Sequence, residues 1–405
     1  MSSYSCPIKH SSTSNSRVRL GRGIVPVPGS RKLCPNHALA HDHRLQAARM
    51  TKGCGGCCSC KSKHVLHLSI ALLPTSLGLN IVLTNDDGWA TANIRSVYNS
   101  LSASDHHVLL VAPPNQPSGV GGTFVLPVNK SLYKAADFNY IPKGAPSWGH
   151  EPNNSIIWYL DGSPSACAIT AEDVLAPKCL PGGKVDLLVA GPNEGDNQGS
   201  AGFPQSGTIG AAYTSNNKSI PGIAFSTLPA VHRFYGNITS SMDPAILIAN
   251  QSARLIDSLN ARYNGTNTTI LPLGIGLNVN YPLLTVPYND SCVTPKFVFS
   301  RISGGSPANG IMFDNMTGLY KSMQDFSALS SFGGNVCLNG KCNLPGEFQV
   351  GPGCQASISI FSTDFDAPAG IASTLMGTLS GVVMTSNSTA SNSTASINST
   401  FSAMI

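Results

Sequence analysis

Two adjacent carboxylates, Asp86 and Asp87, stand between a short apolar run and Gly88. The run at residues 81–83 is typical of a buried parallel strand. A pair at the carboxyl end of such a strand lies where open α/β sheets bind ligands. Buried carboxylates that repel each other favour a cation between them. An Asx turn with Asp87 as the helix N-cap is an equally good interpretation of these residues alone.

Two further apolar runs end in oxygen-bearing side chains. The run at 108–111 leads into a glycine-rich loop with Ser118, and the run at 185–190 leads into a turn with Asn193. Because parallel strands end at one edge of a sheet, we expect these residues near the two aspartates. Such oxygen donors, without thiolate or imidazole, favour Mg²⁺, Mn²⁺ or Ca²⁺ over zinc. The loop lacks both Gly-x-Gly-x-x-Gly and the Walker lysine, so it is only a weak signal for a phosphate loop.

A small-residue segment at 205–212 predicts a helix start whose free backbone amides and hydroxyls suit an anion. No His lies near any of these motifs in the sequence, which argues against a phosphohistidine mechanism. The adjacent pair also lacks the Asp-x-Asp spacing of an aspartyl-phosphate enzyme.

Strand and helix signals alternate through the body of the chain, which predicts an α/β fold with a doubly wound, mostly parallel sheet. Strand- and loop-rich segments near the carboxyl end are expected to cover or extend that sheet. Expected strands cover residues 81–83, 107–112, 126–135, 156–160, 185–190, 221–226, 271–280, 296–302 and 356–361, and expected helices cover 93–101, 164–175, 205–212 and 243–259.

Four segments differ in composition and predict the domain organisation. Residues 1–63 form a basic, Cys-rich leader predicted to be disordered, and 64–78 resemble a secretory signal that is too short for a stable membrane span. Residues 79–383 are predicted to form the folded domain, and 384–405 a low-complexity Ser/Thr/Asn tail. Residues 1–64 hold 11 basic residues and one acidic residue, whereas the remainder holds 14 basic and 19 acidic residues. The mildly acidic body does not indicate binding to a nucleic-acid duplex.

Cysteines and glycosylation sequons both favour a secreted or extracellular protein, with the cell wall as one location. An even number of body cysteines is compatible with disulfides, and we expect the pairs Cys167–Cys179, Cys337–Cys342 and Cys292–Cys354. Dense sequons with few lysines indicate a glycosylated surface. The sequon asparagines are Asn129, Asn153, Asn217, Asn237, Asn250, Asn264, Asn267, Asn289, Asn315, Asn387, Asn392 and Asn398.

The ordered motifs between about residues 79 and 370 resemble those of the SurE-type survival proteins, which are metal-dependent nucleotidases and acid phosphatases. The matching segments are residues 81–88, 111–119, 161–167, 191–197 and 206–212, with weaker echoes at 277–282 and 363–364. The resemblance implies a Rossmann-like fold with a β-rich carboxyl-terminal extension. That extension commonly exchanges between subunits in the family, so a homodimer is one expected state, although the segment after Asp364 diverges.

The resemblance also assigns residues. It implies a divalent-metal site, for Mg²⁺ or Mn²⁺, whose ligands are Asp86, Asp87, Ser118 and Asn193, with Asp86 and Asp87 as the catalytic residues. It implies that Asn197, Ser206, Gly207 and Thr208 border the substrate phosphate. Two departures from the family pattern are Pro117, inserted before the serine, and Pro192 before the asparagine.

The resulting hypothesis is a secreted phosphomonoesterase, of the fungal type, that acts on nucleoside monophosphates or similar small phosphomonoesters. One alternative is a secreted glycoprotein of the same fold that binds metal or nucleotide without catalysis. A dinucleotide-dependent oxidoreductase is another, but Asp86 and Asp87 occupy the turn where its glycine fingerprint belongs.

Overall fold

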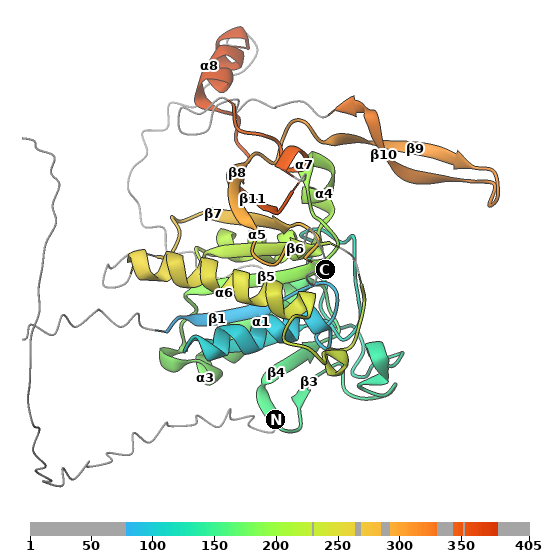
Figure 1. Ribbon diagram of the computed structural model, residues 1–405, viewed down its shortest axis with the longest axis vertical. Helices are drawn as coiled ribbons and strands as arrows, with labels where there is room; N and C mark the ends of the chain where they lie inside the picture. Colours follow the sequence, from blue (N-terminus) through green and yellow to red (C-terminus); the bar gives the residue numbers. More distant parts are fainter. Residues whose placement is uncertain are drawn as a thin grey trace, which may run out of the picture. The chain divides into compact units, whose positions relative to one another are not determined.

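A nine-stranded sheet forms the centre of the part of the chain that the computed structural model describes (Figure 1), in the order β3-β4-β2-β1-β5-β6-β7-β11-β8. The described residues are 78–228, 231–263, 269–284, 292–329, 343–350 and 353–379. The strands are β1 (Asn80–Thr84), β2 (His107–Ala112), β3 (Trp148–Glu151), β4 (Asn154–Leu160), β5 (Leu187–Glu194), β6 (Gly222–Thr227), β7 (Ile275–Tyr281), β8 (Lys296–Ser300) and β11 (Gln355–Ser362).

The strands from β4 to β7 run parallel, and β3 and β11 pair antiparallel with β4 and β7. The expected mostly parallel, Rossmann-like α/β sheet is therefore confirmed. The carboxyl-terminal strands β11 and β8 extend the sheet beyond β7, as predicted.

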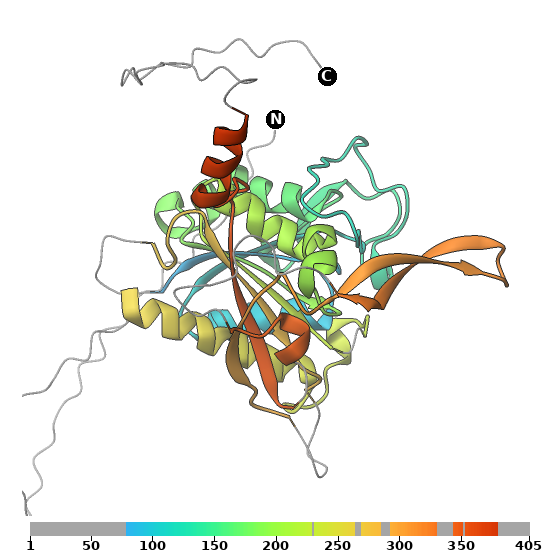
Figure 2. The same cartoon turned by 90° about the horizontal axis from the view of Figure 1, so that it is seen from above.

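Helices cover both faces of the sheet (Figure 2). Helices α1 (Ala92–Ala103) and α6 (Pro244–Tyr263) pack on one face, and α2 (Pro164–Thr170) and α5 (Gly207–Asn217) pack on the other. Strand β1 explains the two layers, because Ile81 and Leu83 enter the core under α1 and α6 while Val82 enters the core under α2 and α5. This alternation buries β1 on both faces and directs its carboxyl end to the edge where the loops gather.

Shorter elements complete the described fold. A two-stranded hairpin, β9 (Pro307–Asp314) and β10 (Leu319–Leu329), projects from the sheet-bearing unit in Figure 1. The remaining helices are α3 (Ala176–Cys179), α4 (Gly199–Gln205), α7 (Glu347–Val350) and α8 (Ala369–Thr378), with a π-helical turn at Ala171–Leu175 and 3₁₀ turns at Asp137–Asn139, Pro181–Gly183 and Tyr235–Asn237. No helix of the described residues is both long and apolar enough to cross a membrane.

The strand expected at residues 126–135 is wrong. This segment forms a loop with an isolated bridge, Ser131 with Pro146, and backbone hydrogen bonds such as that from the Leu132 N–H to the Ala145 carbonyl at 2.8 Å. Leu132 is buried, but Leu126 and Val128 are 48% and 93% exposed, so the run lacks the continuous buried face of a strand. Pro127 also lacks the N–H that a ladder needs.

Strand β5 continues past the expected end at residue 190 and includes Asn193. Its register with β6 shifts between Ala190 and Asn193, which is a bulge around Gly191 and Pro192. A bulge of this kind changes the direction of the side chains that follow it. Pro192 thus lies within the bulge, and the bulge sets the orientation of Asn193.

One of the three expected disulfides is confirmed and one is wrong. Cys292 and Cys354 are joined. Cys167, on α2, is a free thiol buried in the core, and Cys179 is disulfide-bonded but not to Cys167. The pairing of Cys337 with Cys342 also lies outside the described residues, as do the leader and the signal segment up to residue 77 and the tail.

Candidate active site

The turn after β1 is built by Asn85 and not by the aspartates. The Gly88 N–H donates to Asn85 Oδ1 at 3.2 Å, and Asn85 Nδ2 donates to the Gly88 carbonyl at 3.2 Å. Gly88 has a φ of +110°, which a side chain would strain. Helix α1 then begins at Ala92 with Thr91 in the N-cap position. The alternative in which Asp87 caps this helix is therefore wrong, and both carboxylates are left for another role.

Asp86 lies against the start of α5. The Thr208 hydroxyl donates to Asp86 Oδ1 at 2.5 Å. A Cβ added to Gly207 would lie 3.0 Å from Asp86 Oδ2, so glycine permits this close approach. Burial raises the pKa of Asp86, and the hydrogen bonds from Thr208 and from the backbone of Gly207 and Thr208 oppose that rise. The first turn of α5 thus stabilises the Asp86 carboxylate.

Asp87 is fully buried and is held from two sides. Gln116 Nε2 donates to its Oδ1 at 3.2 Å, and the Glu194 N–H donates to its Oδ2 at 2.9 Å. Burial raises the pKa of Asp87 well above the usual range, and the charges of Asp86 and Glu194 raise it further. Two carboxylates therefore share a buried region where their charges repel each other.

Asn193 shares a partner with Asp86. Its Oδ1 lies 3.4 Å from the Thr208 hydroxyl oxygen, which also binds Asp86. Asn193 Nδ2 donates to the Gly195 carbonyl at 2.8 Å, so the amide presents its oxygen toward the aspartates. Three of the four predicted metal ligands are thereby brought together: Asp86 and Asn193 through Thr208, and Asp87 through its bond to the residue after Asn193.

Ser118 lies in a loop that is fixed at both ends. Gln116 binds Asp87, and the Gly121 N–H donates to the Gln205 carbonyl at 2.9 Å, just before α5. Ser118 itself is exposed and forms no hydrogen bond with the rest of the described chain. The loop spans the edge between Asp87 and α5, and the role of Ser118 as a metal ligand stays a prediction.

The residues predicted to border the phosphate form the next layer. Ser206 Oγ accepts the Ile209 N–H at 3.1 Å and so caps α5. Asn197 is buried, and its Nδ2 donates to Ser226 Oγ at 2.8 Å on β6. The backbone N–H groups of Gly207 and Thr208 bond to Asp86. The role of these residues at the substrate phosphate stays a prediction.

Sequence reasoning missed an acid–histidine cluster beside these residues. His232 Nδ1 lies 2.8 Å from Glu194 Oε2, and its Nε2 lies 3.6 Å from Asp137 Oδ2. Phe138 stacks on the His232 ring. Burial raises the pKa of Glu194 to about 7, and the hydrogen bond with His232 opposes the rise. His232 lies 38 residues after Glu194, so no local motif could indicate the pairing.

The chemistry of the donors fits a divalent cation. Neither Asp86 nor Asp87 forms an ion pair with a Lys, Arg or His side chain in the described residues. Burying two adjacent carboxylates without a cation is costly, and hard oxygen donors suit Mg²⁺ or Mn²⁺. The described residues contain no group of three or more His, Cys, Asp or Glu side chains placed to hold a metal. A cation here must therefore take neutral oxygen donors such as that of Asn193.

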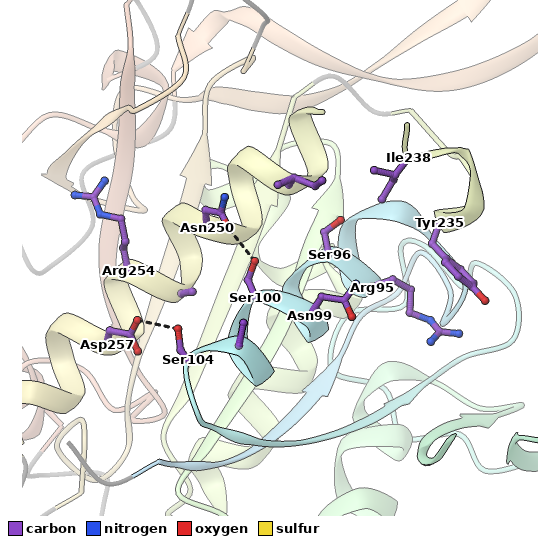
Figure 3. Close-up of a pocket in the computed structure, with 13 residues that line it drawn as sticks. Arg95, Ser96, Asn99, Ser100, Ser104, Tyr235, Ile238, Asn250, Arg254 and Asp257 are labelled. Atoms are coloured by element: carbon purple, nitrogen blue, oxygen red, sulfur yellow. Dashed lines mark hydrogen bonds between the residues drawn. The ribbon is translucent and has the colours of Figure 1, made fainter. Parts of the chain in front are cut away.

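A separate cavity of about 580 Å³ lies between α1 and α6 (Figure 3). Both polar and apolar side chains line it, and two of the polar ones, Ser100 and Ser104, donate to Asn250 and Asp257 at 2.9 and 3.2 Å. None of the predicted site residues lines it, so the cavity lies apart from the predicted phosphate site.

Comparison with known proteins places this geometry in a family. The family described as "Survival protein SurE" matches residues 81–300. An acid phosphatase of Yarrowia lipolytica is 41% identical over 297 residues, which cover 72% of this chain and 81% of that protein. A 5'-nucleotidase SurE of Desulfovibrio desulfuricans is 30% identical over 206 residues, 50% of this chain and 66% of that protein. The crystal structure of a SurE protein from Aquifex aeolicus superposes with a TM-score of 0.48 at 19% identity, covering 74% of this chain and 99% of the other. The chain belongs to the SurE family.

Proposed function

We propose that this protein is a divalent-metal-dependent phosphomonoesterase that hydrolyses nucleoside monophosphates. Its relatives carry the names acid phosphatase and 5'-nucleotidase SurE, which indicate a phosphomonoester hydrolase. The observation that carries the proposal is the buried pair Asp86 and Asp87 without a cationic partner, joined through Thr208 to Asn193.

Asp86, Asp87, Asn193 and Ser118 would hold the cation. When bound, a divalent ion supplies positive charge that polarises a phosphoryl oxygen. The chain's own residues orient these donors: Thr208 fixes Asp86, and Gln116 and the Glu194 N–H fix Asp87. Because these bonds fix the carboxylates in advance, a bound cation would be held ready for the negative charge that develops during phosphoryl transfer.

Asp86 is the residue that we assign to position or deprotonate the attacking water. It lies at the start of α5, where Thr208 and the backbone N–H groups stabilise its ionised form. Gly207 and Thr208 form that helix start and Ser206 caps it; together with Asn197, which is bound to Ser226 on β6, they are assigned to the phosphate. Asn197 and Ser206 act mainly by shaping the turn and capping the helix, because each already binds a protein partner.

The test is hydrolysis of AMP and p-nitrophenyl phosphate by the full chain, before and after EDTA treatment and after adding back Mg²⁺ or Mn²⁺. We expect EDTA to abolish turnover and the added metal to restore it. Full turnover in EDTA-treated protein whose metal content is verified as nil would contradict the metal-dependent mechanism.

We also propose that the protein is secreted and glycosylated. The described sequon residues Asn129, Asn153, Asn217, Asn237, Asn250 and Asn315 are all exposed, which supports this proposal. Peptide N-glycosidase treatment of protein collected from the medium should lower its apparent mass, and amino-terminal sequencing should begin after the signal-like segment at 64–78. Recovery of the chain only inside the cell, with unchanged mass, would contradict it.

A further inference from the structure

The turn that carries Asn197 is clamped by amides of β7. The Asn197 N–H donates to Asn280 Oδ1 at 2.8 Å, and Asn278 Nδ2 donates to the Asn197 carbonyl at 2.9 Å. Its side chain is held by Ser226 on β6. The direction of Asn197 is therefore set by the neighbouring strands rather than by its own loop.

Asn278 also binds a carboxylate from the carboxyl-terminal part of the chain. Its Nδ2 also donates to Glu347 Oε1 at 2.8 Å, so one amide nitrogen serves two acceptors. The other carboxylate oxygen, Glu347 Oε2, accepts the Gly199 N–H at 2.7 Å. Glu347 thus binds Gly199, the first residue of α4, directly. It is linked to Asn197 indirectly, through Asn278.

Glu347 is fully buried and is itself anchored. Its N–H donates to the Arg301 carbonyl at 3.1 Å, and the Arg301 N–H donates to the Pro345 carbonyl at 2.9 Å. It lies beyond residue 300, where the match to the family ends. The carboxyl-terminal extension therefore delivers one side chain to the back of the candidate site.

A carboxylate suits this position because its two oxygens meet two N–H donors. Glutamine has one acceptor oxygen, so its NH₂ group would face either Gly199 or Asn278, donor against donor. Burial makes ionised Glu347 costly and raises its pKa to about 7, with the hydrogen bonds from Gly199, Ser359 and Asn278 opposing the rise. Apart from Ser359 on β11, the side-chain partners of Glu347 are the turn and its support, Gly199 and Asn278, which favours a positioning role.

We propose that Glu347 is a positioning residue for substrate phosphate, which it serves by fixing Asn197 and the start of α4. This inference rests on the proposed function. Glu347 does not touch the substrate; it acts through Asn278 and the Gly199 amide.

The test compares Glu347→Gln with Glu172→Gln in the full chain. Glu172 is a matched control, because it is also a buried glutamate bound to a side chain of α5, Ser215, but it lies away from the predicted site residues. We expect Glu347→Gln to raise the KM for AMP about tenfold, as the loss of one charge-assisted hydrogen bond would, with kcat changed less than about threefold. Glu172→Gln should leave KM unchanged. An equal KM for both variants and the wild type would overturn the proposal.

Two further measurements distinguish a positioning role of Glu347 from a folding defect and from a failure of the proposed function. If Glu347→Gln does not fold, Asn278→Ala cuts the same connection while leaving the Gly199 bond, and failure of both variants to fold would assign Glu347 a purely structural role. Calorimetric titration with inorganic phosphate needs no turnover. A wild type that binds phosphate about tenfold more tightly than Glu347→Gln, but hydrolyses nothing, would refute the proposed function and support the positioning role. Equal phosphate affinities, or no phosphate binding by the wild type, would refute that role.

Discussion

Two buried acidic regions of this protein differ in how their negative charge is compensated. Glu172, in the π-helical turn after α2, is buried and binds Ser215 and the ammonium group of Lys218, whose Nζ lies 3.0 Å from Glu172 Oε2. Burial raises the pKa of Glu172, and the Lys218 charge opposes the rise. Asp86 and Asp87 are as deeply buried but have no such partner in the described residues.

The comparison separates a structural carboxylate from a functional one. At Glu172, which has a structural role, the chain supplies Lys218 to compensate the buried negative charge. Where the described residues supply no cation, as at Asp86 and Asp87, we propose that one binds from solution. A buried charge is costly unless it is paired, so we infer that the aspartate pair takes a cation from outside the described residues.

The largest expected effect comes from Asp87→Asn, which removes one of the two uncompensated charges. We expect kcat/KM for AMP to fall on the order of 10³-fold, as with the loss of a key electrostatic group. The metal-free variant should also unfold at a higher temperature than the metal-free wild type, because the repulsion with Asp86 is gone. Steady-state kinetics and thermal unfolding measure the two changes. Activity above about a tenth of the wild-type value would break the comparison.

Glu347 sharpens the comparison, because it is a buried carboxylate bound only to neutral donors and near Asp196. Its folded-state pKa of about 7 exceeds the ordinary value of 4.5, so the folded protein holds this proton more tightly than the unfolded chain does. Its contribution to stability is therefore greatest below pH 4.5 and is lost as the pH rises toward 7, by roughly 3 kcal/mol.

Urea unfolding of the wild type and Glu347→Gln between pH 4.5 and 8 measures this contribution. The free energy of unfolding of the wild type should fall more steeply with pH than that of the variant, since the other acidic groups are common to both. Parallel curves would show that Glu347 does not titrate in this range.

A smaller effect is expected from Lys218→Met, which leaves Glu172 without its cation. Because Lys218 is 30% exposed, solvent compensates in part, and we expect a loss of about 1–2 kcal/mol in the free energy of unfolding. Turnover of AMP should be unchanged, since this region lies away from the predicted site residues. A variant with normal stability but impaired turnover would reverse the roles that we give to the two regions.

The sequence predicted the parts of the fold that depend on local pattern. The apolar run at 81–83 and the helical spacing at 93–101 correspond to β1 and α1, and Ser163 caps α2 as its position before Pro164 indicates. These predictions hold because a strand buried on both faces and a capped helix are specified within a few residues.

Features that depend on distant partners could not be predicted. The run at 126–135 has apolar residues, but only Leu132 among them is fully buried, and the run forms a loop instead of a strand. Proximity in sequence predicts a bond between Cys167 and Cys179, whereas helix α2 directs Cys167 into the core as a free thiol. His232 and Glu347 lie far from Asp86 and Asp87 in the sequence and approach the candidate site only in the folded chain. No local sequence motif could therefore indicate them.

The most direct test of the uncompensated aspartate pair is calorimetric titration of Mn²⁺ into the EDTA-treated full chain. We expect binding of about one ion per chain in the wild type, binding lost in Asp87→Asn, and binding retained in Lys218→Met. No heat of binding in the wild type, or equal binding in the wild type and Asp87→Asn, would contradict the claim that this pair is balanced by a metal ion.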